Sequence, residues 1–213
     1  MLPFTRDQFL NVFADYNRSL WPFVIALWVA AVWAFVRASD GWREQRKWLS
    51  GLLAVQWAWS AVAYHAAFFA AINPAAVAFS ALFTAEAALL VWHGVIRDDL
   101  RFGDAGTLRR YTSQALIVYA LVYPVLSWLE GNRYPWLPTF GVPCPTTILT
   151  IGFLLAATPP VPHTLVVVPI LWGIIGGSAA FLLDMHVDLM LLLASVGLTL
   201  HAFTTRIPWR QPT

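Results

Sequence analysis

Charged residues are scarce in this chain of 213 residues, where they make up 11% of the sequence. An ordinary soluble domain carries about 25% charged residues. Hydrophobic residues make up 59%, which is more apolar surface than one soluble core of this size can hide. The sequence therefore excludes a soluble domain and predicts an integral membrane protein. The 12 tryptophans and 14 phenylalanines agree with this, because aromatic rings settle at membrane interfaces.

Cysteine, lysine and clusters of basic residues are also lacking. Cys144 is the only cysteine, which excludes an intrachain disulfide and any multi-cysteine metal site. Lys47 is the only lysine and lies in a loop, so no span offers an amine for a Schiff base with retinal. The net charge is +2 and the basic residues are spread over short loops, which excludes a nucleic-acid-binding face. Residues 1–17 lack the apolar core and cleavage motif of a signal peptide.

Seven apolar segments are candidates for membrane spans, each of which needs about 20 apolar residues. They are residues 21–37, 48–71, 75–95, 113–129, 146–157, 164–183 and 189–205. The sequence thus predicts an all-α, polytopic membrane helix bundle of about seven transmembrane helices. We expect one membrane domain over residues 1–213, with the bundle itself at 21–205. The segment 146–157 is short for a span, at about three turns of helix.

Arginine and lysine in the connections predict the orientation of the chain. Three regions are rich in them, namely Arg37, Arg43, Arg46 and Lys47, then Arg97, Arg101, Arg109 and Arg110, and finally Arg206 and Arg210. The connections "INPA" and "DMHVD" carry none. By the positive-inside rule the rich regions are cytoplasmic, which places the N-terminus outside and the tail 206–213 in the cytoplasm. This alternation requires the segment 146–157 to cross the membrane.

Residues 4–17 are expected to form an amphipathic helix before the first span. Thr5 and Gln8 have the spacing of a capping box, and Phe4 can pack on Phe9 as a hydrophobic staple. One face of this helix is apolar and the opposite face is polar. That pattern is typical of a helix that lies in the membrane interface. It fits a helix packed against the outside of the bundle equally well.

Four stretches of the chain together resemble one known family. In order, they are "FTRDQFLNVFADYNRSLWP", "YHAAFFAAINPAA", "FGVPCPTTILTIGFLL" and "PILWGIIGGSAAFLLDMHVDL". They are similar to a bacterial multi-pass membrane family known as domain of unknown function 6064. The resemblance covers nearly the whole chain and implies a bacterial protein of the inner (cytoplasmic) membrane. It implies no activity, so the function has to be inferred from the residues.

Glu86 and His65 are the main candidates for chemistry inside the spans. Glu86 lies near the middle of segment 75–95, and an ionisable group at that depth is costly and a functional candidate by default. A neutral carboxyl group bonded to a hydroxyl is the alternative. His65 lies nearer the external end, where it is a candidate proton relay or metal ligand, and the preceding Tyr64 is a further substrate-binding or proton-linked candidate. A histidine bonded to a backbone carbonyl or a tyrosine is the alternative that we favour.

The stretch "PCPTT" at the start of segment 146–157 is expected to be a helix N-terminus below the membrane surface. Pro145 suits a first helical turn, where Thr146 or Thr147 can bind free N–H groups. The loop before it is expected to dip into the bundle, which requires a covering of protein or water. Cys144 would then be a reactive thiol or soft-metal ligand, or a small buried filler. Tyr123 is a further candidate for the wall of this cavity.

The motif "DMHVD" offers Asp184, His186 and Asp188 as ligands for a cation at the surface. Asp188 is also a natural N-cap for the last helix. Before this motif, the glycines of "GIIGGSAA" create a thin helix face, and we expect the short segment 146–157 to pack on it.

These observations favour a carrier or permease for a small molecule or ion, with an outward-opening polar site. Glu86 and His65 would be its proton-linked pair, and residues 143–147 its half-helix substrate site. Two alternatives stay open. One is an intramembrane enzyme that uses Glu86 and His65, and the other is a non-catalytic membrane subunit or scaffold. The lipid bilayer is the expected partner, and a homo-oligomer or a membrane-protein partner is a further possibility. Nucleic acid is not expected as a partner. The sequence leaves the cofactor content open.

Overall fold

The computed structural model describes residues 2–40, 46–103, 106–158 and 161–204. Within them the chain forms seven α-helices, which confirms the predicted all-α bundle. They are α1 (Arg6–Asp40), α2 (Arg46–Trp59), α3 (Ala76–Leu90), α4 (Thr107–Leu129), α5 (Pro143–Ala156), α6 (Thr164–Leu182) and α7 (Met190–Thr204). Shorter helical pieces extend or join them, namely η1 (Ser60–Ala66), η2 (Phe69–Ala71), η3 (Val91–Ile96) and η4 (His186–Leu189). The predicted tail 206–213 and Arg43 lie outside the described residues.

Six helical stretches of the described chain are long and apolar enough to cross a membrane. They are Arg6–Ala38, Arg46–Ala71, Ala76–Ile96, Thr107–Leu129, Thr164–Leu182 and His186–Thr204. Each contains or nearly matches one predicted span. Many large apolar side chains, such as Trp21, Val62 and Leu193, are exposed on their outer faces. Large exposed apolar surfaces mark sites of contact with other proteins or with a membrane. The outer faces of these helices are therefore suited to contact with lipid.

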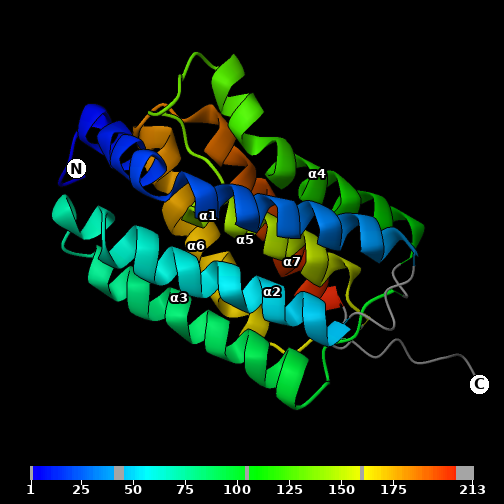
Figure 1. Cartoon of the computed structure of the whole chain (residues 1–213). Coiled ribbons are helices and arrows are strands. Elements are labelled where there is room, and N and C mark those ends of the chain that lie inside the picture. Colours follow the sequence, from blue (N-terminus) through cyan, green and yellow to red (C-terminus); the bar gives the residue numbers. More distant parts are fainter. Residues whose placement is uncertain (1, 41–45, 104–105, 159–160, 205–213) are drawn as a thin grey trace, which may run out of the picture.

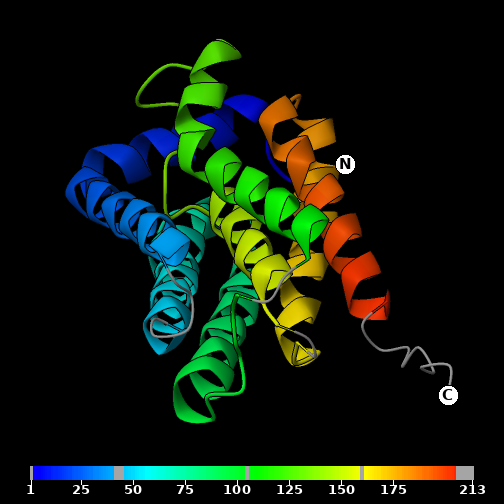
Figure 2. The same cartoon turned by 90° about the vertical axis from the view of Figure 1, so that its right-hand side faces the viewer.

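The short helix α5 forms the centre of the bundle (Figure 1, Figure 2). All of its residues except Cys144 are buried. Helices α2, α4, α6 and α7 contact it. Its length of 14 residues therefore does not have to match the thickness of a bilayer, because other helices separate it from lipid.

Helix α5 both begins and ends inside the protein. At the start, Val142 is extended and Pro143 takes the first helical position, where its fixed φ suits the helix and no N–H is lost. At the finish, the N–H of Gly103 donates to the carbonyl of Ala156 over 3.3 Å, and Arg109 donates to that of Ala157 over 3.3 Å. Partners for these carbonyls keep buried polar backbone from being left unsatisfied.

The loop 130–142 dips into the bundle, as expected, and α1 holds it there. Leu137, Phe140 and Val142 of this loop are buried. The Tyr16 hydroxyl donates to the Phe140 carbonyl over 3.1 Å. Gly141 has a φ of +79°, and a Cβ at this position would lie 2.8 Å from the Tyr16 hydroxyl. Only glycine meets both the backbone conformation and the close approach.

Asn17 carries most of the polar anchoring of this loop. Its side-chain N–H groups donate to the carbonyls of Pro135 over 2.6 Å and Leu137 over 2.8 Å. Its carbonyl oxygen accepts a hydrogen bond from the Thr139 hydroxyl. Asn17 is buried, so each of these groups would lack water as a substitute partner.

Asn17→Ala should therefore destabilise the protein by about 2–3 kcal/mol, since it leaves buried carbonyl groups unpaired. Thermal unfolding in lipid nanodiscs, followed by the helical circular dichroism signal, measures this change. Asn11→Ala is the matched control, because Asn11 lies on the same helix and makes one exposed bond to Trp136. Equal unfolding temperatures for the two variants would contradict the anchoring role of Asn17.

The N-terminal segment is helical but runs without a break into the first span as part of α1. The capping box is confirmed, since Thr5 N–H donates to the Gln8 side chain over 2.9 Å and Gln8 N–H donates back over 3.3 Å. The staple is confirmed too, with the rings of Phe4 and Phe9 5.8 Å apart. Figure 2 shows that the first part of α1 crosses one end of the bundle before the helix bends down beside it. There Phe13 stacks on Tyr64, so bundle side chains cover much of the apolar face, as the packing interpretation expected.

The glycines of α6 pack against α7, and the expectation that they receive α5 is wrong. A Cβ on Gly173 would clash with the Ser195 side chain, and one on Gly177 would lie 2.5 Å from Leu192. Ser195 and Leu192 both belong to α7. The small residues thus let α6 and α7 approach closely at their shared face.

Candidate functional site

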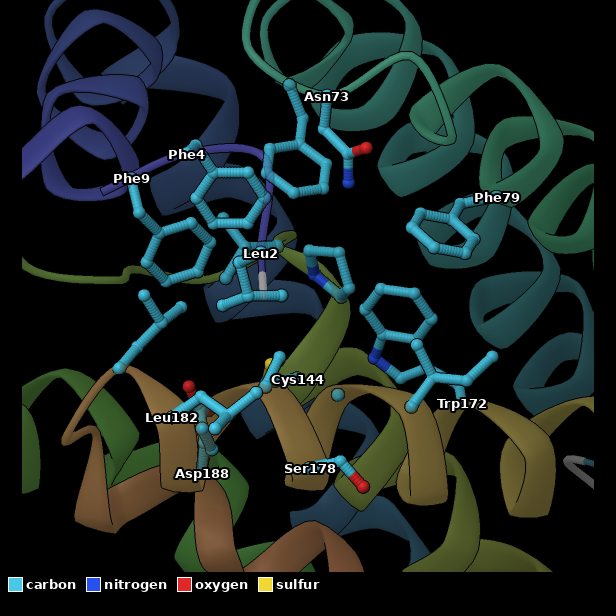
Figure 3. A pocket seen from close by; sticks show the side chains of 18 of the residues that line it. Leu2, Phe4, Phe9, Asn73, Phe79, Cys144, Trp172, Ser178, Leu182 and Asp188 are labelled. Atoms are coloured by element: carbon cyan, nitrogen blue, oxygen red, sulfur yellow. The ribbon is translucent and has the colours of Figure 1, made fainter. Parts of the chain in front are cut away.

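A pocket of about 400 Å³ lies at the end of the bundle where α1 begins (Figure 3). Its walls come from the start of α1, the start of α3, the start of α5 and the second half of α6. This is the end predicted to be external. The volume falls within the range of small-molecule sites, which is about 300–1,000 Å³.

The lining of the pocket is mainly apolar. Aromatic rings and aliphatic side chains supply most of it, including Leu2, Phe4, Phe9, Phe13, Phe69, Phe79, Ile175 and Leu183. Among the described residues that line it there is no lysine, arginine or glutamate. Ile174, Ser178 and Leu182 of α6 belong both to the lining and to the exposed surface of the bundle. The pocket therefore opens along α6, on a surface that faces lipid if α6 spans the membrane.

Among the described residues of the lining, Asp188 is the one that is acidic. It belongs to η4, and its side chain is buried rather than turned to solvent. The hydroxyl of Tyr123 donates a hydrogen bond to one of its carboxyl oxygens. Tyr119, one turn earlier on α4, donates to the neighbouring Val187 carbonyl over 2.8 Å. Two tyrosines of α4 thus hold this turn, and Tyr123 lies behind the pocket rather than in its wall.

The metal site suggested by "DMHVD" is not formed by the described residues. Asp184 and His186 are exposed and contact each other, with 3.2 Å between their side chains. Asp188 turns inward to Tyr123 instead. Within the described ranges, no group of three or more His, Cys, Asp and Glu side chains is placed to hold a metal ion. Asp184 has a φ of 56° and lies in the tight turn between α6 and α7. This turn places Asp184 and His186 at the surface and Asp188 in the interior.

Cys144 lines the pocket, and it is the one residue of α5 that is not fully buried. The two neighbouring prolines lack N–H groups, so this helix start offers few free donors. The hydroxyls of Thr146 and Thr147 are buried and have no hydrogen-bond partner within the described ranges, and neither residue lines the pocket. The expected capping of α5 by these threonines is therefore wrong. Of the predicted stretch "PCPTT", Pro143 and Cys144 line the cavity, and the other three residues do not.

Trp172 contributes an unsatisfied donor to the pocket. The residue is 6% exposed, and its indole N–H has no nitrogen or oxygen partner in the part of the chain that the structure describes, with only the weakly accepting thiol of Cys144 beside it. Figure 3 shows the nitrogen edge of this ring directed into the cavity on the side of Cys144. Sequence reasoning missed Trp172, because nothing in the local pattern sets it apart from the other tryptophans, of which there are 12 in total.

Tyr64 and His65 lie in η1, a π-helical continuation of α2. π-Helical turns are often found at functional sites. Within this wider helical turn, the consecutive side chains of Tyr64 and His65 are both buried. Tyr64 lines the pocket, whereas His65 lies behind it, with its ring 5.1 Å from that of Trp172 and 4.7 Å from that of Phe83. Neither ring nitrogen of His65 has a hydrogen-bond partner, so the expected bond to a carbonyl or tyrosine is absent from the described structure.

Glu86 is fully buried on α3, away from the pocket, and neither carboxyl oxygen has a hydrogen-bond partner among the described residues. The directly bonded pair with His65 is therefore not formed. His65 packs on Phe79 at one end of the α2–α3 pair, and Ser50 faces Gly94 at the other. This register places Glu86 level with the stretch from Gln56 to Ser60, in which the side chains of Gln56 and Ser60 are also buried without a hydrogen-bond partner among the described residues. The middle of the bundle thus contains several unsatisfied polar groups.

A model described as "Family of unknown function (DUF6064)" matches residues 6–210, which is nearly the whole chain. No curated protein and no solved structure matches the chain.

Proposed function

This chain belongs to the DUF6064 family of unknown function, and we propose that it is a membrane protein that binds a small amphiphilic molecule taken from the bilayer. The observation that carries the proposal is the pocket of about 400 Å³, with apolar walls, a few convergent polar groups and a rim on the exposed face of α6. Sites for small molecules are typically built in this way.

The location of the pocket supports a carrier for such a molecule in a bacterial inner membrane. The loop charges predict that this end of the bundle is external, with the N-terminus outside and the C-terminus in the cytoplasm. A molecule that partitions into the outer leaflet would reach the pocket along α6. The start of a half-helix, α5, forms the floor of the pocket at Pro143 and Cys144, as broken helices do in transporters.

Proton-linked movement of that molecule is the second candidate function. Glu86 favours it, because a buried carboxyl group without a partner is costly inside a membrane and marks proton pathways in pumps and transporters. His65 lies between this level and the pocket and is a candidate for passing the proton on.

Cys144 offers a direct test of the pocket, because it is the only cysteine in the chain and it lines the cavity. In phosphatidylcholine nanodiscs at alkaline pH, which increases the reactive thiolate form of this partly buried residue, a dodecanoyl monoacylglycerol should slow the reaction of Cys144 with N-ethylmaleimide several-fold. Mass spectrometry of the intact protein measures the labelled fraction over time. The reaction slows because the bound chain excludes the reagent from the thiol.

The matched control moves the thiol to the exposed face of α7, in the double variant Cys144→Ser, Leu193→Cys. Leu193 is 67% exposed and does not line the pocket. Labelling at position 193 should be unchanged by the amphiphile. An equal effect at both positions, or no effect at Cys144, would contradict the proposed binding function.

A further inference from the structure

We infer that the polar groups of this pocket select an uncharged head group that bears a hydroxyl, through Asp188 and Trp172, and reject a carboxylate. The inference rests on the proposed binding function and names the class of its ligand as a single-chain amphiphile with a hydroxyl head.

Two groups of opposite hydrogen-bonding character face the same cavity. Asp188 lines it and has one carboxyl oxygen engaged by Tyr123, which leaves the other as an acceptor for a ligand. The indole of Trp172 can only donate, and among the described residues it has no nitrogen or oxygen partner, with only the weakly accepting Cys144 thiol beside it. In Figure 3 Cys144 lies between these two residues along the floor of the pocket.

A hydroxyl group matches this pair because it donates one hydrogen bond and accepts others. It can donate to Asp188 and accept from the Trp172 N–H, which would satisfy a buried donor that otherwise has only the weakly accepting Cys144 thiol beside it. An unpaired buried donor carries a desolvation cost, so a ligand that removes this cost gains affinity.

A carboxylate head fits the same cavity poorly. Its oxygens can accept from Trp172 but cannot donate to Asp188, and their negative charge would lie near a second carboxyl group. The described lining contains no arginine or lysine to offset that charge. Like charges brought together in a binding site suppress the wrong partner, and this effect supplies specificity.

Protection of Cys144 from N-ethylmaleimide in phosphatidylcholine nanodiscs tests the selection. The two probes are dodecanoyl monoacylglycerol and dodecanoate, measured at alkaline pH, where the carboxylate is ionised. In the unchanged protein the monoacylglycerol should protect at a concentration at least about tenfold lower than dodecanoate. Because both probes carry the same acyl chain, a difference between them reports the head group.

Asp188→Asn should reduce this preference to within about threefold, because the amide removes the charge but keeps an acceptor for Tyr123. Asp184→Asn is the matched control, since this exposed carboxyl lies at the same end of the bundle and outside the pocket. It should leave the preference unchanged. Trp172→Phe should weaken protection by the monoacylglycerol roughly threefold to tenfold, as the loss of one hydrogen bond predicts.

The outcomes separate this inference from the function on which it rests. Protection by neither probe contradicts the binding function itself. Equal protection by both probes, or an undiminished preference in Asp188→Asn, overturns the head-group selection and leaves the binding function in place. Should Trp172→Phe fail to fold, because Trp172 also packs on His65, the two aspartate variants still decide the matter.

Discussion

Gly152→Ala should destabilise the bundle by about 1–3 kcal/mol, because α4 leaves no space for a side chain at this position of α5. A Cβ on Gly152 would lie 2.7 Å from a side-chain carbon of Ile117 and 3.2 Å from the Ile117 backbone nitrogen. It would also lie 3.2 Å from the carbonyl oxygen of Ser113. Backbone atoms of a packed helix cannot move aside as the end of a flexible side chain does, so α4 and α5 would have to separate. Thermal unfolding in nanodiscs measures the loss.

Gly197→Ala is the matched control for this prediction. Gly197 also lies inside a helix, α7, but a Cβ there would meet nothing within 4 Å. Alanine at this site should be neutral or stabilising by up to about 1 kcal/mol, since glycine is the poorer helix former. The two variants make the same chemical change, so the difference between them isolates the contact with α4. An equally stable Gly152→Ala variant would show that α5 is not tightly held at the centre.

The short helix α5 shows how far composition could lead. Its apolar run and its prolines predicted a helix that begins inside the protein after a dipping loop, and the structure confirms both features. Its central position was not predictable, because a helix that is apolar on all sides can face either lipid or protein. Only the contacts with α2, α4, α6 and α7 distinguish the two cases.

The partner of the α6 glycines was predicted wrongly for a different reason. Small residues show that another helix approaches, but they do not identify it. The connection between α6 and α7 is short, which makes these helices antiparallel neighbours, and Gly173 accordingly meets Ser195. Connection length was therefore the better guide than the shortness of α5.

The site residues were predicted in part. Cys144 and Tyr64 do line the pocket, and Asp188 does too, although the sequence suggested it as a metal ligand beside Asp184. Adjacent positions in a sequence do not share an environment when a tight turn separates them, as the turn before η4 does here. The wall formed by the start of α1 depends on a contact between distant parts of the chain, such as that of Phe4 with Phe69. A single sequence carries no direct signal for such a contact.

Glu86→Leu should raise the stability of the protein by about 1–3 kcal/mol. Both carboxyl oxygens of Glu86 are buried, and neither has a hydrogen-bond partner in the described part of the chain. Burial of an unpaired polar group is costly, and an apolar residue of similar size avoids this cost. The rise should appear as a higher unfolding temperature in nanodiscs. Glu130→Leu is the control, because Glu130 is exposed at the end of α4 and should have little effect.

The same variant separates a structural Glu86 from one that carries protons. A protein that retains an unpaired carboxyl at the centre of its bundle, at a cost in stability, has a functional reason to keep it. We therefore expect Glu86→Leu to be more stable and yet to leave binding in the pocket unchanged, since Glu86 lies outside the lining. Movement of the amphiphile across a proteoliposome membrane, driven by a pH gradient, should occur in the unchanged protein and be lost in Glu86→Leu and Glu86→Gln. A lower stability of Glu86→Leu would instead show that Glu86 has a stabilising partner in the membrane, such as a bound water or ion.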